Sequence, residues 1–342
     1  MTTAFIFPGQ GSQAVGMGRA LGESFAQARA VFEETDGALS QKLSTLMFEG
    51  PEPELTLTAN AQPALMAVSV AVMQVLEAET GLDLKRDAAF VAGHSLGEYS
   101  ALCAASAFSL ADTARLLRLR GEAMQKAVAP GDGAMAALLG LDAEGAAAAA
   151  TQAAADTGLV CQVANDNAPG QVVVSGAKAA VERAVAIAKE KGARRAMLLP
   201  VSAPFHCALM QPAADAMAAA LAAHPPVAPI VPLVANMEAA PISDPALIRE
   251  SLVRQVTGTV RWRESIARMA SLGVTRFVEV GSGKVLAGLV KRIAEGASVI
   301  SIGAPADISG FTAQACCHSR SRCRQGQGSF HRKRGARLKC ST

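Results

Sequence analysis

Aromatic side chains are scarce in this chain of 342 residues, which contains one Trp, one Tyr and 11 Phe. Hydrophobic residues still make up 51 % of the sequence. The length corresponds to roughly two domains, or to one large domain with an insertion. We therefore expect a globular, alanine-rich and mainly helical protein that buries a sizeable core.

The sequence also lacks a hydrophobic run that we expect to cross a bilayer. The most apolar run, at residues 63–76, is too short and is interrupted by Gln74. The N-terminus lacks the basic segment of a secretory signal, because the strand-like residues 4–7 begin at once. We therefore predict a cytoplasmic protein that does not engage a membrane.

Acidic residues are absent from the tail at residues 311–342, which holds eight of the 32 basic residues and four of the seven cysteines. Without this tail, the net charge changes from +3 to −5. A mildly acidic body argues against nucleic-acid binding. The tail has no apolar period and is expected to be disordered. A zinc site is the alternative there, although its Cys and His spacings fit no tetrahedral pattern. The other cysteines, Cys103, Cys161 and Cys207, are expected to be reduced and buried.

The most informative stretch is Gly-His-Ser-Leu-Gly at residues 93–97, which has the form G-x-S-x-G. An apolar run precedes it and a run of small residues follows, a pattern that predicts a strand, a tight turn and a helix. Such a turn exposes the hydroxyl of Ser95. The next backbone N–H, on Leu96, then lies at a helix start, where it can hold an oxyanion. A glycine turn that holds an ordinary serine is the alternative.

Histidine is scarce as well, and elimination selects one of the five as a partner for Ser95. Two lie in the tail and His224 lies in a linker-like segment before two prolines. His94 is expected to point to the opposite face of the strand from Ser95, because side chains alternate along a strand. His206, in a loop, remains as the general base. An ordinary hydrogen-bonded loop histidine is the alternative.

A helix expected at residues 109–127 places Arg120 beside its apolar stripe, whereas the other polar residues of this helix fall on the far side. A lone arginine in such a place most often extends its stem along apolar surface. The functional alternative is a buried guanidinium that holds a substrate carboxylate with two parallel hydrogen bonds.

The loop at residues 8–13 has two interpretations. Its glycines match the relaxed dinucleotide fingerprint G-x-G-x-x-A, but no second mononucleotide-binding half follows. Alternatively, the loop brings a backbone N–H and a glutamine beside Ser95.

The hydrophobic pattern changes after residue 130 and predicts the order β-α-β-β-α-β, with a turn at residues 165–170. We interpret residues 131–200 as a small inserted ferredoxin-like subdomain. Residues 1–130 and 201–310 then form the two parts of a large α/β-hydrolase-like domain with a parallel sheet core. The last core strand is expected at residues 276–280.

Seven short motifs occur in order along the chain. They are Phe-Pro-Gly-Gln-Gly-Ser-Gln at 7–13, Gly-His-Ser-Leu-Gly-Glu-Tyr-Ser-Ala at 93–101, Arg-Gly at 120–121, Asn-Ala-Pro-Gly-Gln-Val at 167–172, Pro-Phe-His at 204–206, Leu-Val-Arg-Gln at 252–255 and Glu-Val-Gly-Ser-Gly-Lys-Val-Leu at 279–286. Together they closely resemble the bacterial malonyl-CoA:acyl carrier protein transacylases of type II fatty acid synthesis. The resemblance covers residues 1 to about 308, so it gives the tail no counterpart and suggests that the tail is non-native.

The resemblance implies a role for each matching residue. Ser95 is the nucleophile that carries a malonyl ester, and His206 acts as general base and then as general acid. Arg120 pairs with the free malonyl carboxylate. The backbone N–H groups of Gln10 and Leu96 form the oxyanion hole.

Three further roles come from the resemblance alone. The main-chain carbonyl of Gln255 orients the histidine, which explains why no acidic partner stands out in the sequence. Asn167 lies near the substrate. Phe205, together with Leu96, accompanies a preference for malonyl over methylmalonyl groups.

The resemblance thus implies a monomeric acyltransferase that moves a malonyl group from malonyl-CoA to the phosphopantetheine thiol of acyl carrier protein, without a cofactor or metal. Three alternatives remain. One is a serine hydrolase or esterase that uses the same Ser–His site, and another is a trans-acting acyltransferase of a polyketide synthase (PKS). The third is a non-catalytic module that binds the carrier or a dinucleotide. Arg120 argues against a plain esterase, because a neutral ester gives no reason for a buried guanidinium.

Overall fold

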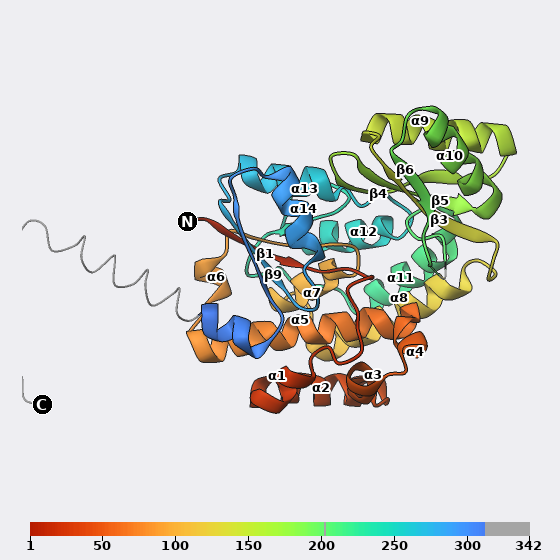
Figure 1. The fold of residues 1–342 in the computed structure, drawn as a ribbon. Coiled ribbons are helices and arrows are strands. Elements are labelled where there is room, and N and C mark those ends of the chain that lie inside the picture. The colour runs from red at the N-terminus through yellow and green to blue at the C-terminus, as the bar shows by residue number, and fades with distance from the viewer. Residues whose placement is uncertain (202, 312–342) are drawn as a thin grey trace, which may run out of the picture.

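The computed structural model describes residues 1–201 and 203–311, in which the strands form two sheets (Figure 1). The larger sheet contains β1 (Thr3–Phe7), β2 (Phe90–Gly93), β7 (Leu233–Val234), β8 (Pro241–Ile242), β9 (Arg276–Val280) and β10 (Ser298–Ile302). Its order is β10-β9-β1-β2-β7-β8, and every neighbouring pair is parallel except β7 with β8. Apart from Phe311, the predicted tail lies outside the described residues.

Helices cover both faces of this sheet (Figure 1). The helices that precede the smaller sheet in the chain are α1 (Arg19–Ser24), α2 (Ala26–Leu39), α3 (Leu43–Glu49), α4 (Glu52–Thr56), α5 (Thr58–Thr80), α6 (Leu84–Asp87), α7 (Gly97–Ala104) and α8 (Leu110–Lys126). After the smaller sheet come the 3₁₀ turn η1 (Ala208–Met210), α11 (Gln211–Ala223), α12 (Pro245–Gln255), α13 (Trp262–Ser271) and α14 (Val285–Ile293).

Strand β1 is buried on both of its faces, which explains its run of apolar residues. Phe5 and Phe7 pack into the core on the α5 side of the sheet, whereas Ala4 and Ile6 pack against α13 and α14. All five residues of β1 are buried. A parallel sheet covered on both faces requires such a continuous apolar run, so the fold is a mixed α/β structure.

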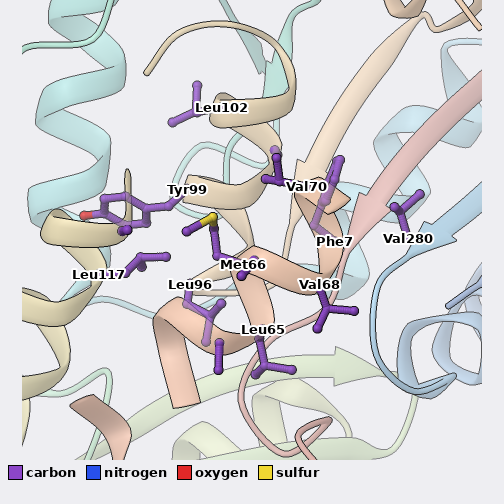
Figure 2. Close-up of a cluster of buried hydrophobic side chains, with 14 of the residues drawn as sticks. Phe7, Leu65, Met66, Val68, Val70, Leu96, Tyr99, Leu102, Leu117 and Val280 are labelled. Atoms are coloured by element: carbon purple, nitrogen blue, oxygen red, sulfur yellow. The ribbon is translucent and has the colours of Figure 1, made fainter. Parts of the chain in front are cut away.

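Helix α5 lies in the centre of the larger core. Figure 2 shows its side chains among those of β1, β9, α7 and α8; the labelled residues are Phe7, Leu65, Met66, Val68, Val70, Leu96, Tyr99, Leu102, Leu117 and Val280. With 23 residues, α5 is long and apolar enough to cross a membrane by length and composition, but 89 % of its most apolar window is buried inside the protein. A helix that is apolar on all sides is typical of a protein core.

Helix α5 starts before the apolar run at residues 63–76. The helix begins at Thr58 and Pro63 lies inside it. Its first turn is held from α8, where the side-chain Oε1 of Gln125 accepts a hydrogen bond from the backbone N–H of Ala59 at 2.7 Å. A tertiary contact of this kind outweighs the local tendency of proline to start a helix.

The smaller sheet is antiparallel and has the order β4-β5-β3-β6. Its elements are β3 (Gly133–Leu139), α9 (Ala143–Thr157), β4 (Cys161–Ala168), β5 (Gln171–Ala177), α10 (Lys178–Glu190) and β6 (Arg195–Leu198). The turn predicted at residues 165–170 is wrong in extent, because β4 continues to Ala168. The polar residues 165–167 therefore belong to an extended strand. The pairing of β4 with β5 has two irregularities here, and Asn165 also forms a bridge with Val260.

The expectation that β9 is the last core strand is also wrong. The bounds of β9 match the predicted residues 276–280, but β10 follows and pairs with β9 in parallel. Four of the five β10 residues keep some exposure, so this edge strand lacks the continuous apolar run of β1.

A glycine sets the distance between α5 and α8. A Cβ atom added to Gly121 would lie 2.6 Å from both the Cα of Ala59 and the carbonyl oxygen of Thr58. Gly121→Ala is therefore expected to destabilise the protein by about 1–3 kcal/mol, because backbone atoms must move. Thermal unfolding measures the change. Gly37→Ala in α2 is the matched control, since nothing lies within 4 Å of its added Cβ. The control should keep or slightly raise the melting temperature, and equal melting temperatures in both variants would contradict the prediction.

Candidate active site

The serine of the G-x-S-x-G stretch lies on a sharp turn between β2 and α7. Ser95 has a positive φ of 54°, which is unusual for a residue with a side chain. The turn needs its glycines, because a Cβ on Gly93 would lie 1.8 Å from the carbonyl carbon of Gly97. This geometry matches the strand–turn–helix context that the sequence predicts.

A histidine from a distant part of the chain meets this serine. The Oγ of Ser95 lies 2.8 Å from the Nε2 of His206. The Nδ1 of His206 lies 2.8 Å from the main-chain oxygen of Gln255. A carbonyl can only accept, so Nδ1 carries the proton and Nε2 is free to accept the hydroxyl proton of Ser95. His206 therefore has the tautomer that a general base requires.

The surroundings of His206 keep its ring neutral. Burial, reinforced by the positive charge of Arg120, lowers the pKa of His206 from 6.5 to about 3. The hydrogen bond to Gln255 acts in the opposite direction but is the weaker influence. The base is consequently in its proton-accepting form at neutral pH.

A buried cation lies beside this pair. Arg120 is only 1 % exposed. It donates hydrogen bonds to Oε1 of Gln62 at 2.8 Å, to Oε1 of Gln255 at 2.8 Å and to Oγ of Ser95 at 3.1 Å. Within the described part of the chain, its Nε has no hydrogen-bond partner and no carboxylate lies within ion-pair distance. Neutral oxygens leave the charge of Arg120 available to an anionic ligand.

The start of α7 offers a donor for an oxyanion. The N–H groups of residues 97–99 donate to carbonyls three residues back. The corresponding carbonyl for Leu96 belongs to Gly93, which instead accepts from Nδ2 of Asn236 at 2.8 Å. Within the described residues, the N–H of Leu96 thus remains one of the unpaired donors of a helix start.

These groups share a cavity of about 350 Å³ between the two sheets. Seven of the eight site residues predicted from the sequence line it, namely Gln10, Ser95, Leu96, Arg120, Asn167, Phe205 and His206. The eighth, Gln255, is fully buried behind His206. The small sheet contributes Met135 and Val173 to the wall, whereas Leu289 comes from α14.

His94 corrects one expectation. It lines the same cavity as Ser95, and its Nε2 lies 2.8 Å from Oδ1 of Asn167. The alternation of side chains does not extend to it, because β2 ends at Gly93. Gly9 permits this packing, since a Cβ there would lie 3.0 Å from Nδ1 of His94.

Other site residues were missed in the sequence. The Oδ1 of Asn236 accepts from the backbone N–H of Ser95 at 2.9 Å, and Gln62 contacts Arg120. Asn236 follows β7 at the carboxyl end of the parallel sheet, where ligand sites of such folds gather. That position is the signal that could have identified it.

The dinucleotide interpretation of the loop at residues 8–13 is not supported. The first helix after this loop begins only at Arg19, so no helix N-terminus lies at the glycines. Within residues 1–201 and 203–311, no group of three or more His, Cys, Asp or Glu side chains could hold a metal ion.

Comparison with known proteins agrees with this geometry. A family model described as an acyl transferase domain matches residues 4–306. The chain belongs to the acyl transferase family. It is 47 % identical over 305 residues to the malonyl CoA-acyl carrier protein transacylase of Bacillus subtilis (strain 168), covering 89 % of this chain and 94 % of that protein. Its identity to the transacylase of Escherichia coli (strain K12) is 46 %, with 88 % and 96 % covered.

Solved structures of the family are similar as well. The acyl-carrier-protein-S-malonyltransferase of Bartonella henselae has a TM-score of 0.89 and 57 % identity, with 92 % of this chain and 100 % of that chain covered. A malonyl-transacylase in complex with a type II PKS acyl carrier protein has a TM-score of 0.88 and 40 % identity, with the same coverage. The family resemblance seen in the sequence is confirmed.

The low pKa of His206 predicts the pH profile of this acyl transferase. Because the ring stays neutral far below its ordinary pKa of 6.5, kcat/KM for acyl transfer should show no loss near pH 6.5 as the pH falls. The profile can be measured from about pH 7 down to about pH 4.

Removal of the nearby positive charge in Arg120→Ala should raise the pKa of His206 and move the acid limb to higher pH. The exposed Arg115→Ala on the same helix is the control and should leave the profile unchanged. An acid limb near 6.5 in the unaltered protein would contradict this assignment.

Proposed function

We propose that the protein transfers a malonyl group from malonyl-CoA to the phosphopantetheine thiol of acyl carrier protein through an ester on Ser95, and so supplies the chain-extender units of fatty acid synthesis. One observation carries this proposal. A serine–histidine pair and a buried guanidinium without a carboxylate partner face the same cavity. The relatives that share the chain's length bear the name of this activity.

In the first half-reaction, Oγ of Ser95 attacks the thioester carbonyl while Nε2 of His206 takes the hydroxyl proton. The carbonyl of Gln255 stabilises the imidazolium that forms. The N–H groups of Leu96 and Gln10 hold the oxyanion of the tetrahedral intermediate. When the carbon–sulfur bond breaks, His206 returns its proton to the departing CoA thiolate, which leaves malonyl-Ser95.

The second half-reaction uses the same groups in the same order. The thiol of the carrier's phosphopantetheine gives its proton to His206 and attacks the ester carbonyl. Collapse of the intermediate breaks the carbon–oxygen bond, and Ser95 recovers the proton from His206. The sequence of two transfers through one ester is a ping-pong mechanism.

Arg120 selects the acyl group. Its guanidinium lies 3.1 Å from Oγ of Ser95, so a carboxylate that follows the reacting carbonyl after one methylene can reach it. An acetyl group offers this buried guanidinium no carboxylate, so it forgoes a charge pair that contributes on the order of several kcal/mol to malonyl binding. The same reasoning disfavours a plain esterase. Phe205 and Leu96 narrow the cavity, and Asn167 contacts the substrate chain.

We assign residues 131–200 to a ferredoxin-like subdomain inserted into an α/β-hydrolase-like domain formed by residues 1–130 and 201–310. The strand order β4-β5-β3-β6 and the alternation of strands and helices support this division. We further propose that the protein is a monomer located in the cytoplasm. Its partners in this proposal are malonyl-CoA and acyl carrier protein. The burial of α5 agrees with a location away from membranes.

A second candidate partner is the carrier of a PKS. The structure of a malonyl-transacylase with a type II PKS acyl carrier protein, at 40 % identity to this chain, favours this alternative. The chemistry at Ser95 would be the same, since both carriers present the thiol of a phosphopantetheine arm.

Malonyl-CoA alone, without a carrier, should acylate Ser95. Intact-mass spectrometry followed by peptide mapping is expected to find one malonyl adduct on the unaltered protein and none on Ser95→Ala. Ser100→Ala is the matched control, because Ser100 is a buried serine of α7 outside the cavity lining. A protein that never forms the adduct, or forms it equally in Ser95→Ala, is not the proposed transferase.

Arg120→Ala should reduce kcat/KM for malonyl-CoA by about a hundredfold or more, because a desolvated charge pair of roughly 3 kcal/mol is lost. Transfer from acetyl-CoA should not fall in parallel, since acetyl has no carboxylate. Steady-state assays with both thioesters measure the ratio, with Arg115→Ala as the control. Unchanged malonyl transfer in Arg120→Ala would exclude the proposed selectivity.

A further inference from the structure

A carboxyl group lies directly beneath the serine turn and takes no part in the mechanism above. Glu98 is the second residue of α7, and its side chain is fully buried. Its Oε1 accepts a hydrogen bond from the backbone N–H of Asn236 at 2.6 Å, and its Oε2 accepts one from Nε2 of Gln255. Both of these contacts are with donors, which stabilise the ionised form of Glu98 relative to the protonated form.

Glu98 determines which way the amide of Gln255 faces. The Nε2 of Gln255 donates to Glu98 and also to the carbonyl oxygen of Ser95 at 3.0 Å. Its Oε1 therefore points the other way and accepts from Arg120 at 2.8 Å. With the amide reversed, an NH₂ group would face the guanidinium, which has donors only. The main-chain oxygen of the same residue holds His206.

The amide of Gln255 thus joins two buried charges of opposite sign. Arg120 and Glu98 are 1 % and 0 % exposed. Three other ionisable groups act on this pair. Glu238 opposes the ionisation of Glu98, Tyr99 carries a hydroxyl whose pKa burial raises, and His206 is neutral. Burial raises the pKa of Glu98 to about 8 against the opposing influence of its two donors and Arg120, so Glu98 is mainly an anion above that pH.

We propose that Glu98 is a positioning residue and the internal counter-anion of the acyl-binding Arg120. Through Gln255 it orients the acceptors for Arg120 and His206, and its ionised form balances the guanidinium charge when no acyl group is bound. A bound malonyl carboxylate then shares one cation with Glu98. This sharing moderates the affinity for malonyl groups, which must leave the site after each transfer. The inference rests on the proposed function, because it assumes that Arg120 receives the malonyl carboxylate.

A variant of the same shape isolates the charge. Glu98→Gln removes the anion and places an NH₂ group against the donor of either Asn236 or Gln255. Binding is measured by calorimetry at about pH 9, where Glu98 is ionised, in the Ser95→Ala background, where no turnover occurs. Removal of the competing anion should make malonyl-CoA bind about tenfold tighter, with the affinity for CoA unchanged. In the protein that retains Ser95, kcat should fall by about tenfold to a hundredfold, because His206 and Arg120 lose their fixed acceptors.

The opposite outcomes are equally informative. If the role of Glu98 is purely structural, Glu98→Gln should bind both malonyl-CoA and CoA more weakly. Equal or weaker binding of malonyl-CoA, with the affinity for CoA unchanged, would overturn the proposal. An unchanged kcat would overturn it as well. If Ser95→Ala binds malonyl-CoA no better than CoA, the proposed function fails instead, before Glu98 is altered. Glu122→Gln is the matched control, since Glu122 is a partly exposed acid of α8 outside the cavity lining, and it should change neither value.

A second variant keeps the test decisive if Glu98→Gln does not fold. Glu98→Gln combined with Gln255→Glu exchanges the amide and the carboxylate, so the number of charges is preserved. The carboxylate now contacts Arg120 directly and competes with the ligand. Malonyl-CoA should bind at least tenfold more weakly than in Ser95→Ala alone, while CoA binds equally. Equal affinity for malonyl-CoA would refute the counter-anion role.

Discussion

The hydrogen bonds of Gln255 are the constraint on which the whole site depends. Its main-chain oxygen sets the tautomer of His206, its Oε1 receives Arg120, and its Nε2 reaches the carbonyl of Ser95. One residue at the end of α12 thereby fixes the imidazole of His206, the guanidinium of Arg120 and the turn that carries the proposed nucleophile. A buried amide can serve all three because it presents a donor and an acceptor in opposite directions, so that every partner is matched in kind.

The parallel sheet explains why residues so distant in sequence meet here. The loop after β1, the serine turn after β2 and Asn236 after β7 all leave the sheet at its carboxyl edge. Side chains at this edge of a parallel sheet converge regardless of their separation in the chain. The smaller sheet lines the other side with apolar residues, a wall that disfavours the water that would hydrolyse the proposed ester on Ser95.

The sequence predicted the parts of the site that local patterns encode. The turn at Ser95 carries its glycine spacing, and His206 followed from the scarcity of histidine. Arg120 could be placed beside an apolar stripe, but whether it was buried depended on α5 and α12, which lie far away in sequence. The roles of Gln10, Gln255, Asn167 and Phe205 came from family resemblance, since nothing local marks them. Asn236 and Gln62 act only through contacts that the complete fold creates, so no motif marks them in the sequence. His94 was misplaced because the strand ends one residue before it.

The backbone at the two members of the pair has an energetic consequence. Ser95 has a φ of 54° and His206 a φ of 60°, so both lie in the left-handed region that residues with a side chain seldom adopt. Each such conformation costs on the order of 1 kcal/mol and persists only because the surrounding fold holds it. The strain at the pair is therefore supported by the packing of the rest of the protein, so that the geometry of the site and the stability of the fold are coupled.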